Sequence, residues 1–289
     1  MLRAYRDHYY QSSDGLRLYA RDYDGADTDA PVVLCMHGLT RNSVDFEALI
    51  EILPLHYRVL SVDQRGRGNS EYDPNPDNYQ VNVYVNDMLH LLDELEVKQA
   101  ALIGTSMGGI MAIVMQARWP RRFSGIVLND IGPELDPVGM QRITSSVSDA
   151  PPVENWKQAI ESLKQDLQYA FPKYLEADWQ ELTQRLYRED ERGVPVLNYD
   201  PLISRPMSAQ NDDSSSVLWS MFDAICELPL LLVRGELSDL LSMQCVQEMQ
   251  SRHASMQFVE VPDVGHVPIL NERLAAEAII EFLNSVCGD

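Results

Sequence analysis

The sequence predicts an α/β fold in which a mostly parallel sheet is interrupted by a helical insertion. Short apolar runs alternate with helix-periodic stretches in the first and last parts of the chain. This alternation stops between residues 133 and 223, where helical patterns with charged faces follow one another. Near the centre, an apolar run leads into Gly104-x-Ser106-x-Gly108 and then into a helical pattern, which predicts strand, sharp turn and helix.

The first part of the chain predicts a hairpin followed by buried strands. Asp14-Gly15 lies between two extended runs, which is a hairpin signal. The later runs are continuously apolar, as is typical of parallel strands that are covered on both faces. The strands expected here span residues 6–12, 16–23, 32–36, 57–62, 100–103 and 123–128. The helices expected here span residues 42–53 and 83–95, with a third starting after Ser106.

The remaining pattern divides the chain into a core and a cap. Between residues 133 and 223 we expect helices at 139–147, 154–169 and 174–187, a loop at 189–216 and a helix from 217. Alternation then resumes, with strands at 230–233 and 256–261 and helices at 242–252 and 274–286. We therefore expect a core formed by residues 1–132 and 224–289, and a helical cap formed by residues 133–223.

The composition narrows the choice of partners. The chain has 44 acidic and 23 basic residues, a formal net charge of −21. Such a charge argues against nucleic acid and anionic membranes as partners. The first residues lack the apolar segment of a signal peptide, and no run is long enough to span a bilayer. We expect a cytoplasmic protein with a small-molecule partner; the sequence leaves open whether it forms a homo-oligomer.

No metal or cofactor site is expected. The four cysteines are far apart and show no C-x-x-C spacing, which favours reduced, mostly buried thiols. The six histidines include no H-x-x-x-H pair. The chemistry is therefore expected to depend on side chains and backbone groups alone.

Ser106 is the candidate nucleophile. A serine at the apex of a strand-to-helix turn adopts a strained backbone, so the residues two before and two after it must be small. Gly104 and Gly108 meet this requirement. The following helix directs its free N–H groups at the serine, and these favour developing negative charge.

A serine nucleophile needs a base and a group that orients the base. His266, in a loop behind Gly265, is the candidate base. Asp239, after the penultimate strand, is the candidate orienting acid. Asp130 is its rival, because it follows the strand at 123–128 and also stands at a strand end. Asp263 is so close to His266 in sequence that we interpret it as a turn residue.

The oxyanion requires two converging N–H donors. The backbone N–H of Met107, next to the nucleophile, is one candidate. The backbone N–H of Leu39, after the strand at 32–36, is the other. His37 is interpreted as a structural residue that shapes this loop.

These pieces together resemble the cap-bearing branch of the α/β-hydrolase superfamily over nearly the whole chain. The matching motifs are His37-Gly38, Asp63-x-Arg65-Gly66-x-Gly68-x-Ser70, Gly104-x-Ser106-x-Gly108-Gly109, Arg234-Gly235 with Asp239, and Gly265-His266. The resemblance implies an eight-stranded, mostly parallel sheet flanked by helices, with a cap inserted after the sixth strand. It also implies the catalytic order Ser106, Asp239, His266.

The sequence departs from some relatives in that family. His37-Gly38-Leu39-Thr40 is not the H-G-G-G form of many lipases, which makes bulky acyl groups less suitable substrates. A serine stands where similar dehalogenases and epoxide hydrolases use aspartate, which argues against both activities.

The expected function is that of a serine esterase. We expect cleavage of small to medium carboxylic esters through an acyl-enzyme, without a cofactor. Enol-lactonase and C–C bond hydrolase activities of aromatic degradation are alternatives within the same family. Acyl transfer to an acceptor other than water is an alternative of another class. The three triad candidates argue against a non-catalytic receptor.

Overall fold

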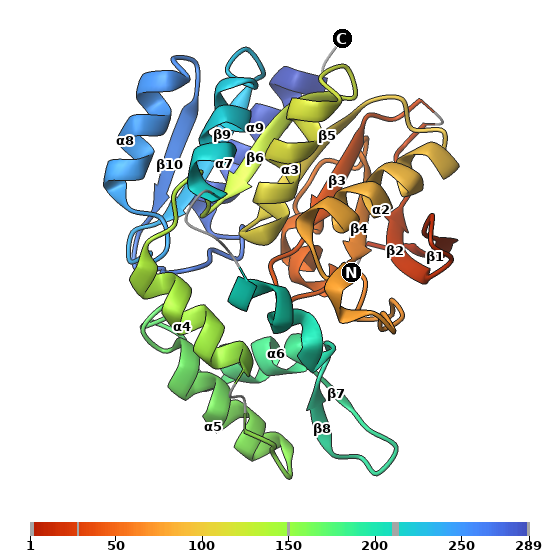
Figure 1. The fold of residues 1–289 in the computed structure, drawn as a ribbon, viewed down its shortest axis with the longest axis vertical. Helices are drawn as coiled ribbons and strands as arrows, with labels where there is room; N and C mark the ends of the chain where they lie inside the picture. The colour runs from red at the N-terminus through yellow and green to blue at the C-terminus, as the bar shows by residue number, and fades with distance from the viewer. Residues whose placement is uncertain (1–2, 28, 149–150, 210–213, 288–289) are drawn as a thin grey trace.

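A computed structural model describes residues 3–27, 29–148, 151–209 and 214–287 (Figure 1). Its main sheet has eight strands in the order β1-β2-β4-β3-β5-β6-β9-β10. The strands are β1 (Arg6–Gln11), β2 (Arg17–Tyr23), β3 (Val32–Met36), β4 (Arg58–Asp63), β5 (Ala100–Thr105), β6 (Phe123–Asn129), β9 (Leu230–Gly235) and β10 (Gln257–Val261). The expected strands are all present.

The sheet is mostly parallel. β1 pairs antiparallel with β2, and β2 pairs antiparallel with β4, whereas the pairs from β4 to β10 are parallel. The carboxyl ends of β3, β5, β6, β9 and β10 therefore meet at one edge, where open α/β sheets bind their ligands. This arrangement confirms the predicted fold class.

Helices cover both faces of this sheet (Figure 1). Side chains of α2 (Val81–Glu94), α3 (Met107–Arg118) and α8 (Met243–Arg252) share an apolar cluster with one face. Side chains of α1 (Glu47–Ile50) and α9 (Arg273–Cys287) share a second cluster with the other face. Two short 3₁₀ helices, η1 (Ser43–Phe46) and η2 (Pro76–Asn78), lie in the connecting loops. Among the described helices, none combines the length and apolar character needed to cross a bilayer.

The segment between β6 and β9 supplies a separate group of elements. It holds α4 (Pro137–Ser148), α5 (Trp156–Leu167), α6 (Glu176–Leu186), β7 (Tyr187–Glu189), β8 (Pro195–Leu197), η3 (Pro201–Ala209) and α7 (Ser214–Asp223). In Figure 1, α4, α5, α6 and the β7–β8 hairpin lie together below the main sheet. Apolar side chains of α5, α6, the β7–β8 hairpin and the adjoining loops form a third cluster, which includes the buried Phe171 and Trp179, whereas those of α4 pack against the first cluster. We call residues 133–223 the insert.

Two parts of the insert differ from the sequence-based expectation. The region expected to be loop, residues 189–216, contains β8 and η3, and β7 pairs with β8 in an antiparallel hairpin. The final helix, α7, belongs to the apolar cluster of the core through Phe222 and lies beside α3 (Figure 1). The division into a core (residues 1–132 and 224–289) and a cap (residues 133–223) stays a prediction.

Candidate active site

The turn between β5 and α3 presents Ser106 at its apex. Ser106 has φ 50° and ψ −114°, a conformation that few non-glycine residues adopt. The chain can bend this tightly because the flanking glycines lack a Cβ. A Cβ on Gly104 would lie 2.4 Å from the carbonyl oxygen of Gly108, and one on Gly108 would lie 2.0 Å from that of Met36.

A chain of two hydrogen bonds links Ser106 to a buried carboxylate. His266 Nε2 is 3.1 Å from Ser106 Oγ, and His266 Nδ1 is 2.7 Å from Asp130 Oδ2. Because a carboxylate only accepts, Nδ1 carries the proton and Nε2 is free to accept the hydroxyl proton of Ser106. This is the geometry of an activated nucleophile.

Asp130 is held as a fully buried acceptor. It directly follows β6 and has no exposed surface. Besides His266, the backbone N–H of Gly235 donates to Oδ1 at 3.0 Å and the hydroxyl of Ser238 donates to Oδ2 at 2.7 Å. These three donors satisfy the carboxylate and fix its orientation toward the imidazole.

The predicted contact between Asp239 and His266 is wrong; the structure gives that place to Asp130. The guanidinium of Arg142, on α4, donates from Nε and Nη2 to the two carboxylate oxygens of Asp239, at 2.7 and 2.8 Å. Partial burial opposes ionisation of Asp239, but the hydrogen bonds and charge of Arg142 outweigh it and lower the pKa of that carboxyl. Asp263 lies in an ion pair with Lys173 on the surface, as expected of a turn residue.

The loop that carries Leu39 is shaped by two buried side chains. His37 Nε2 accepts from the backbone N–H of Gln64 at 3.0 Å, so its Nδ1–H donates to the carbonyl of Gly38 at 2.6 Å. Burial lowers the pKa of His37 to about 3, so this imidazole stays neutral. On the other side, Arg67 Nε donates to the carbonyl of Leu39 at 2.9 Å. Both contacts fix the backbone beside Ser106.

The two expected oxyanion donors have no acceptor within the described part of the chain. The backbone N–H of Leu39 makes no hydrogen bond there, and Met107, as the first residue of α3, has no intrahelical partner for its N–H. Gly38, next to Leu39, approaches the nucleophile closely, since a Cβ at that position would lie 3.7 Å from Ser106 Cβ. Their assignment as oxyanion donors stays a prediction.

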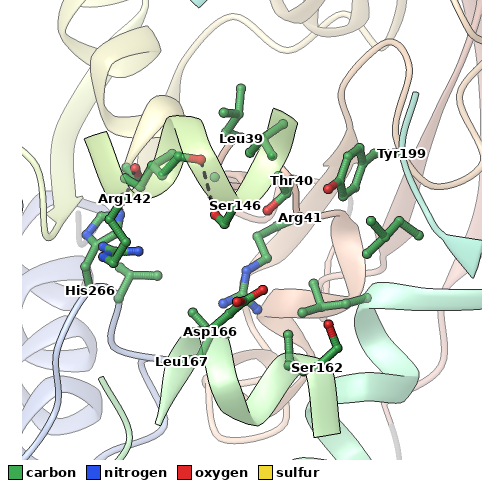
Figure 2. A pocket seen from close by; sticks show the side chains of 18 of the residues that line it. Leu39, Thr40, Arg41, Arg142, Ser146, Ser162, Asp166, Leu167, Tyr199 and His266 are labelled. Carbon is green, nitrogen blue, oxygen red and sulfur yellow. Dashed lines mark hydrogen bonds between the residues drawn. The ribbon is translucent and has the colours of Figure 1, made fainter. Parts of the chain in front are cut away.

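Two cavities meet at Ser106. The larger, about 660 Å³, is lined mostly by apolar side chains, among them Met107, Ile110 and Met140. The smaller, about 130 Å³, is lined by His266, Arg41, Arg142, Ser162 and Asp166 together with apolar residues. Figure 2 shows the smaller cavity, with Arg142 and His266 toward one end and Arg41 extending toward its middle.

The charged residues of the smaller cavity were not anticipated from the sequence. Arg41 directly follows the His37-Gly38-Leu39-Thr40 loop, and that position was a usable signal. Arg142 and Asp166 lie in the insert, whose sequence carries no recognisable motif. Asp166 is exposed; desolvation raises the pKa of its carboxyl, and the charge of Arg142 opposes the rise.

Comparisons with known proteins concern the chain as a whole. A family model described as alpha/beta hydrolase fold matches residues 31–272. The 3-hydroxybutyrate-oligomer hydrolase of Cupriavidus necator is 33% identical over 264 residues, which cover 89% of each chain. The 2-(acetamidomethylene)succinate hydrolase of Mesorhizobium japonicum is 26% identical over 260 residues, 88% of each chain.

A solved structure is similar throughout its length. The crystal structure of an alpha/beta hydrolase from Novosphingobium aromaticivorans superposes with a TM-score of 0.92 at 37% sequence identity. The match covers 99% of this chain and 100% of that one. With the family model covering most of the sequence, these likenesses show that the chain belongs to the alpha/beta hydrolase fold family.

Proposed function

We propose that the chain is a serine hydrolase that cleaves small to medium carboxylic esters through an acyl-enzyme. The observation that carries this proposal is the hydrogen-bonded series Ser106–His266–Asp130 at the meeting point of two cavities. A partly exposed serine hydroxyl within hydrogen-bond distance of an imidazole nitrogen is what acyl transfer requires.

The proposed reaction has two halves. Ser106 Oγ attacks the ester carbonyl while His266 Nε2 takes its proton, and the backbone N–H groups of Leu39 and Met107 stabilise the oxyanion. His266 then returns the proton to the leaving alcohol. In the second half, His266 takes a proton from water while the resulting hydroxide attacks the carbonyl carbon of the acyl-enzyme. The bond from that carbon to Ser106 Oγ then breaks, His266 returns the proton to Oγ, and the carboxylic acid leaves. Asp130 orients the imidazole and stabilises its charged form throughout.

The insert is proposed to act as a cap that sets substrate range. Its helix α4 contributes Met140 to the larger cavity and Arg142 to the smaller one, so both cavities have the insert as a wall. The name of the Cupriavidus necator relative suggests short oligoesters of hydroxy acids as one class to include among the substrates.

The test is a screen of p-nitrophenyl esters with acyl chains of two to twelve carbons, with an enol-lactone as a rival substrate. We expect turnover of short and medium esters, and Ser106→Ala should lower kcat by about 10³- to 10⁶-fold while the fold is kept. A fluorophosphonate probe should label the wild-type protein at Ser106. Ester turnover by Ser106→Ala near the wild-type rate would rule the proposal out.

A further inference from the structure

The position of His266 decides which cavity receives which half of an ester. The general acid must lie within hydrogen-bond reach of the leaving oxygen. Ser106 lines both cavities, but His266 lines only the smaller one, whereas Met107 and the apolar side chains beyond it line the larger one. The leaving alcohol therefore belongs in the smaller cavity, and the acyl chain belongs in the larger, mostly apolar one.

Arg41 is a nearly buried cation with few partners. Only 11% of its side chain is exposed, and the one hydrogen bond that this side chain makes among the described residues runs from Nη1 to Asp45 Oδ1, at 3.3 Å. A guanidinium carries five N–H donors, and the unpaired nitrogens of Arg41 are not among the fully buried atoms of the described residues that lack a partner, so they keep access to the cavity. Its position in the wall of the smaller cavity places those donors where a bound group can accept them.

Arg142 adds a second guanidinium to the same cavity. Its Nε and Nη2 are taken by Asp239, while its Nη1 has no acceptor among the described residues. The ring of Tyr169 lies 4.6 Å from the guanidinium carbon and supports it from the side. Planar, two-oxygen anions match the donor geometry of guanidinium groups, and a carboxylate is the commonest of these.

We propose that the smaller cavity binds a carboxylate carried by the leaving alcohol, with Arg41 as its main partner and Arg142 as its second. The preferred substrates are then esters in which an apolar acyl chain is joined to the hydroxyl of a short hydroxy acid whose own acid group is free. This inference rests on the proposed function. In the reaction, the acyl C–O bond breaks, His266 protonates the leaving oxygen, and the hydroxy acid departs with its carboxylate unchanged.

Asp166 limits where the carboxylate can lie. Its side chain lines the same cavity and is exposed to solvent, which weakens its repulsion of an anion without removing it. An anion bound to Arg41 and Arg142 should therefore avoid Asp166. Removing the charge with Asp166→Asn should strengthen the preference for anionic substrates, an effect opposite in sign to that of removing Arg41.

The experiment compares two esters that differ in one charge. The first is 3-hexanoyloxybutyrate, and the second is its neutral counterpart, 3-hexanoyloxybutyramide. The measured quantity is the ratio of their kcat/KM values. We expect the wild-type protein to favour the anionic ester by about tenfold or more, as charge-assisted hydrogen bonds would give. Arg41→Gln should bring the ratio close to one, and Arg41→Lys should keep part of it.

Arg252→Gln is the matched control. Arg252 lies on α8, pairs with Glu248 and Asp223, and lines neither cavity. Its substitution should leave the ratio at the wild-type value. A wild-type ratio of one or below overturns the inference. So does an Arg41→Gln variant that loses activity equally on both esters, because that result would indicate a general structural role.

p-Nitrophenyl hexanoate separates this inference from the proposed function. Its leaving group carries no carboxylate, so its hydrolysis reports ester cleavage alone. If the wild-type protein hydrolyses it while the ratio of the two test esters is one, the carboxylate subsite is wrong and the esterase proposal stands. If none of the esters is cleaved, or Ser106→Ala cleaves them normally, both are wrong.

Discussion

Arg142 and Asp239 form a two-point ion pair, with hydrogen bonds of 2.7 and 2.8 Å, between helix α4 of the insert and the loop after β9. Both oxygens of Asp239, the carboxylate that the order of motifs assigns to the triad, thus accept from Arg142. The imidazole of His266 instead contacts Asp130, 136 positions before it in the chain. Two carboxylates that follow adjacent strands, β6 and β9, therefore have different partners.

Substitution of these two aspartates should give unequal losses of activity. Asp130→Asn removes the charge that orients His266 and favours the wrong tautomer, so kcat for a p-nitrophenyl ester should fall by about 10³- to 10⁴-fold. Asp239→Asn should keep kcat within about tenfold of wild type. Steady-state kinetics of both variants, with folding checked by circular dichroism, makes the comparison. The reverse order of losses would restore Asp239 as the orienting acid.

The glycine two residues after the nucleophile should not tolerate a methyl group. A Cβ on Gly108 would lie 2.0 Å from the carbonyl oxygen of Met36, a backbone atom that cannot move without distorting β3. Gly108→Ala should lower the free energy of unfolding by at least about 2 kcal/mol. Gly38→Ala is the control, since its nearest neighbour would be 3.7 Å away; its effect should stay within about 0.5 kcal/mol. Urea unfolding measures both, and equal losses would contradict the steric argument.

His37 should make the protein less stable as the pH falls below neutrality. Its pKa is about 3 in the folded chain and 6.5 as the ordinary value, so between these pH values only the unfolded chain binds a proton at this position. Stability from this group is therefore complete above about pH 6.5 and declines as the pH falls toward 3, by up to about 1.4 kcal/mol per pH unit.

The variant His37→Gln isolates this contribution, because glutamine can accept from the N–H of Gln64 without titrating. The difference in free energy of unfolding between wild type and variant should shrink by about 1 kcal/mol from pH 7 to pH 5.5. Other titrating groups, such as Asp87, whose burial raises its pKa to about 6, cancel in this difference. A difference that stays constant with pH would show that His37 is not held neutral.

Filling the larger cavity should shorten the preferred acyl chain. Met140 lies on α4 and lines that cavity, so Met140→Trp should lower kcat/KM for the longest accepted p-nitrophenyl esters while acetyl and butyryl esters are spared. Val138, on the same helix, is 69% exposed and lines neither cavity, so Val138→Trp is the matched control. An unchanged chain-length profile for Met140→Trp would mean that acyl chains do not occupy this cavity.

Local patterns were sufficient to predict most of the core. The strands buried on both faces are short apolar runs. The turn at Ser106 is bounded by glycines because a Cβ at either position would clash with nearby backbone. The pairing of Ser106 with His266 followed from the chemistry of a serine nucleophile, which requires a base at a strand end. These features depend on interactions within a few residues or on chemical necessity.

The choice between Asp130 and Asp239 could not be made in the same way. Both follow strands that are neighbours in the sheet, so both reach the same edge. The two carboxylates differ in that Asp239 is paired with Arg142. Arg142 lies 97 positions before Asp239, in a helix whose sequence shows no motif. The hairpin β7–β8 escaped prediction because each strand has three residues, too few for a pattern.

Gly265 donates its N–H to the carbonyl of Ala170 at 2.7 Å, and a Cβ at Gly265 would lie 2.8 Å from the Cα of Ala170. His266, the proposed base, is therefore the next residue after a point where the backbones of the insert and the core are in contact. The rest of the insert can vary in sequence as substrates change. An insert that is grafted onto another core, however, must reproduce this contact to keep the imidazole of His266 in position.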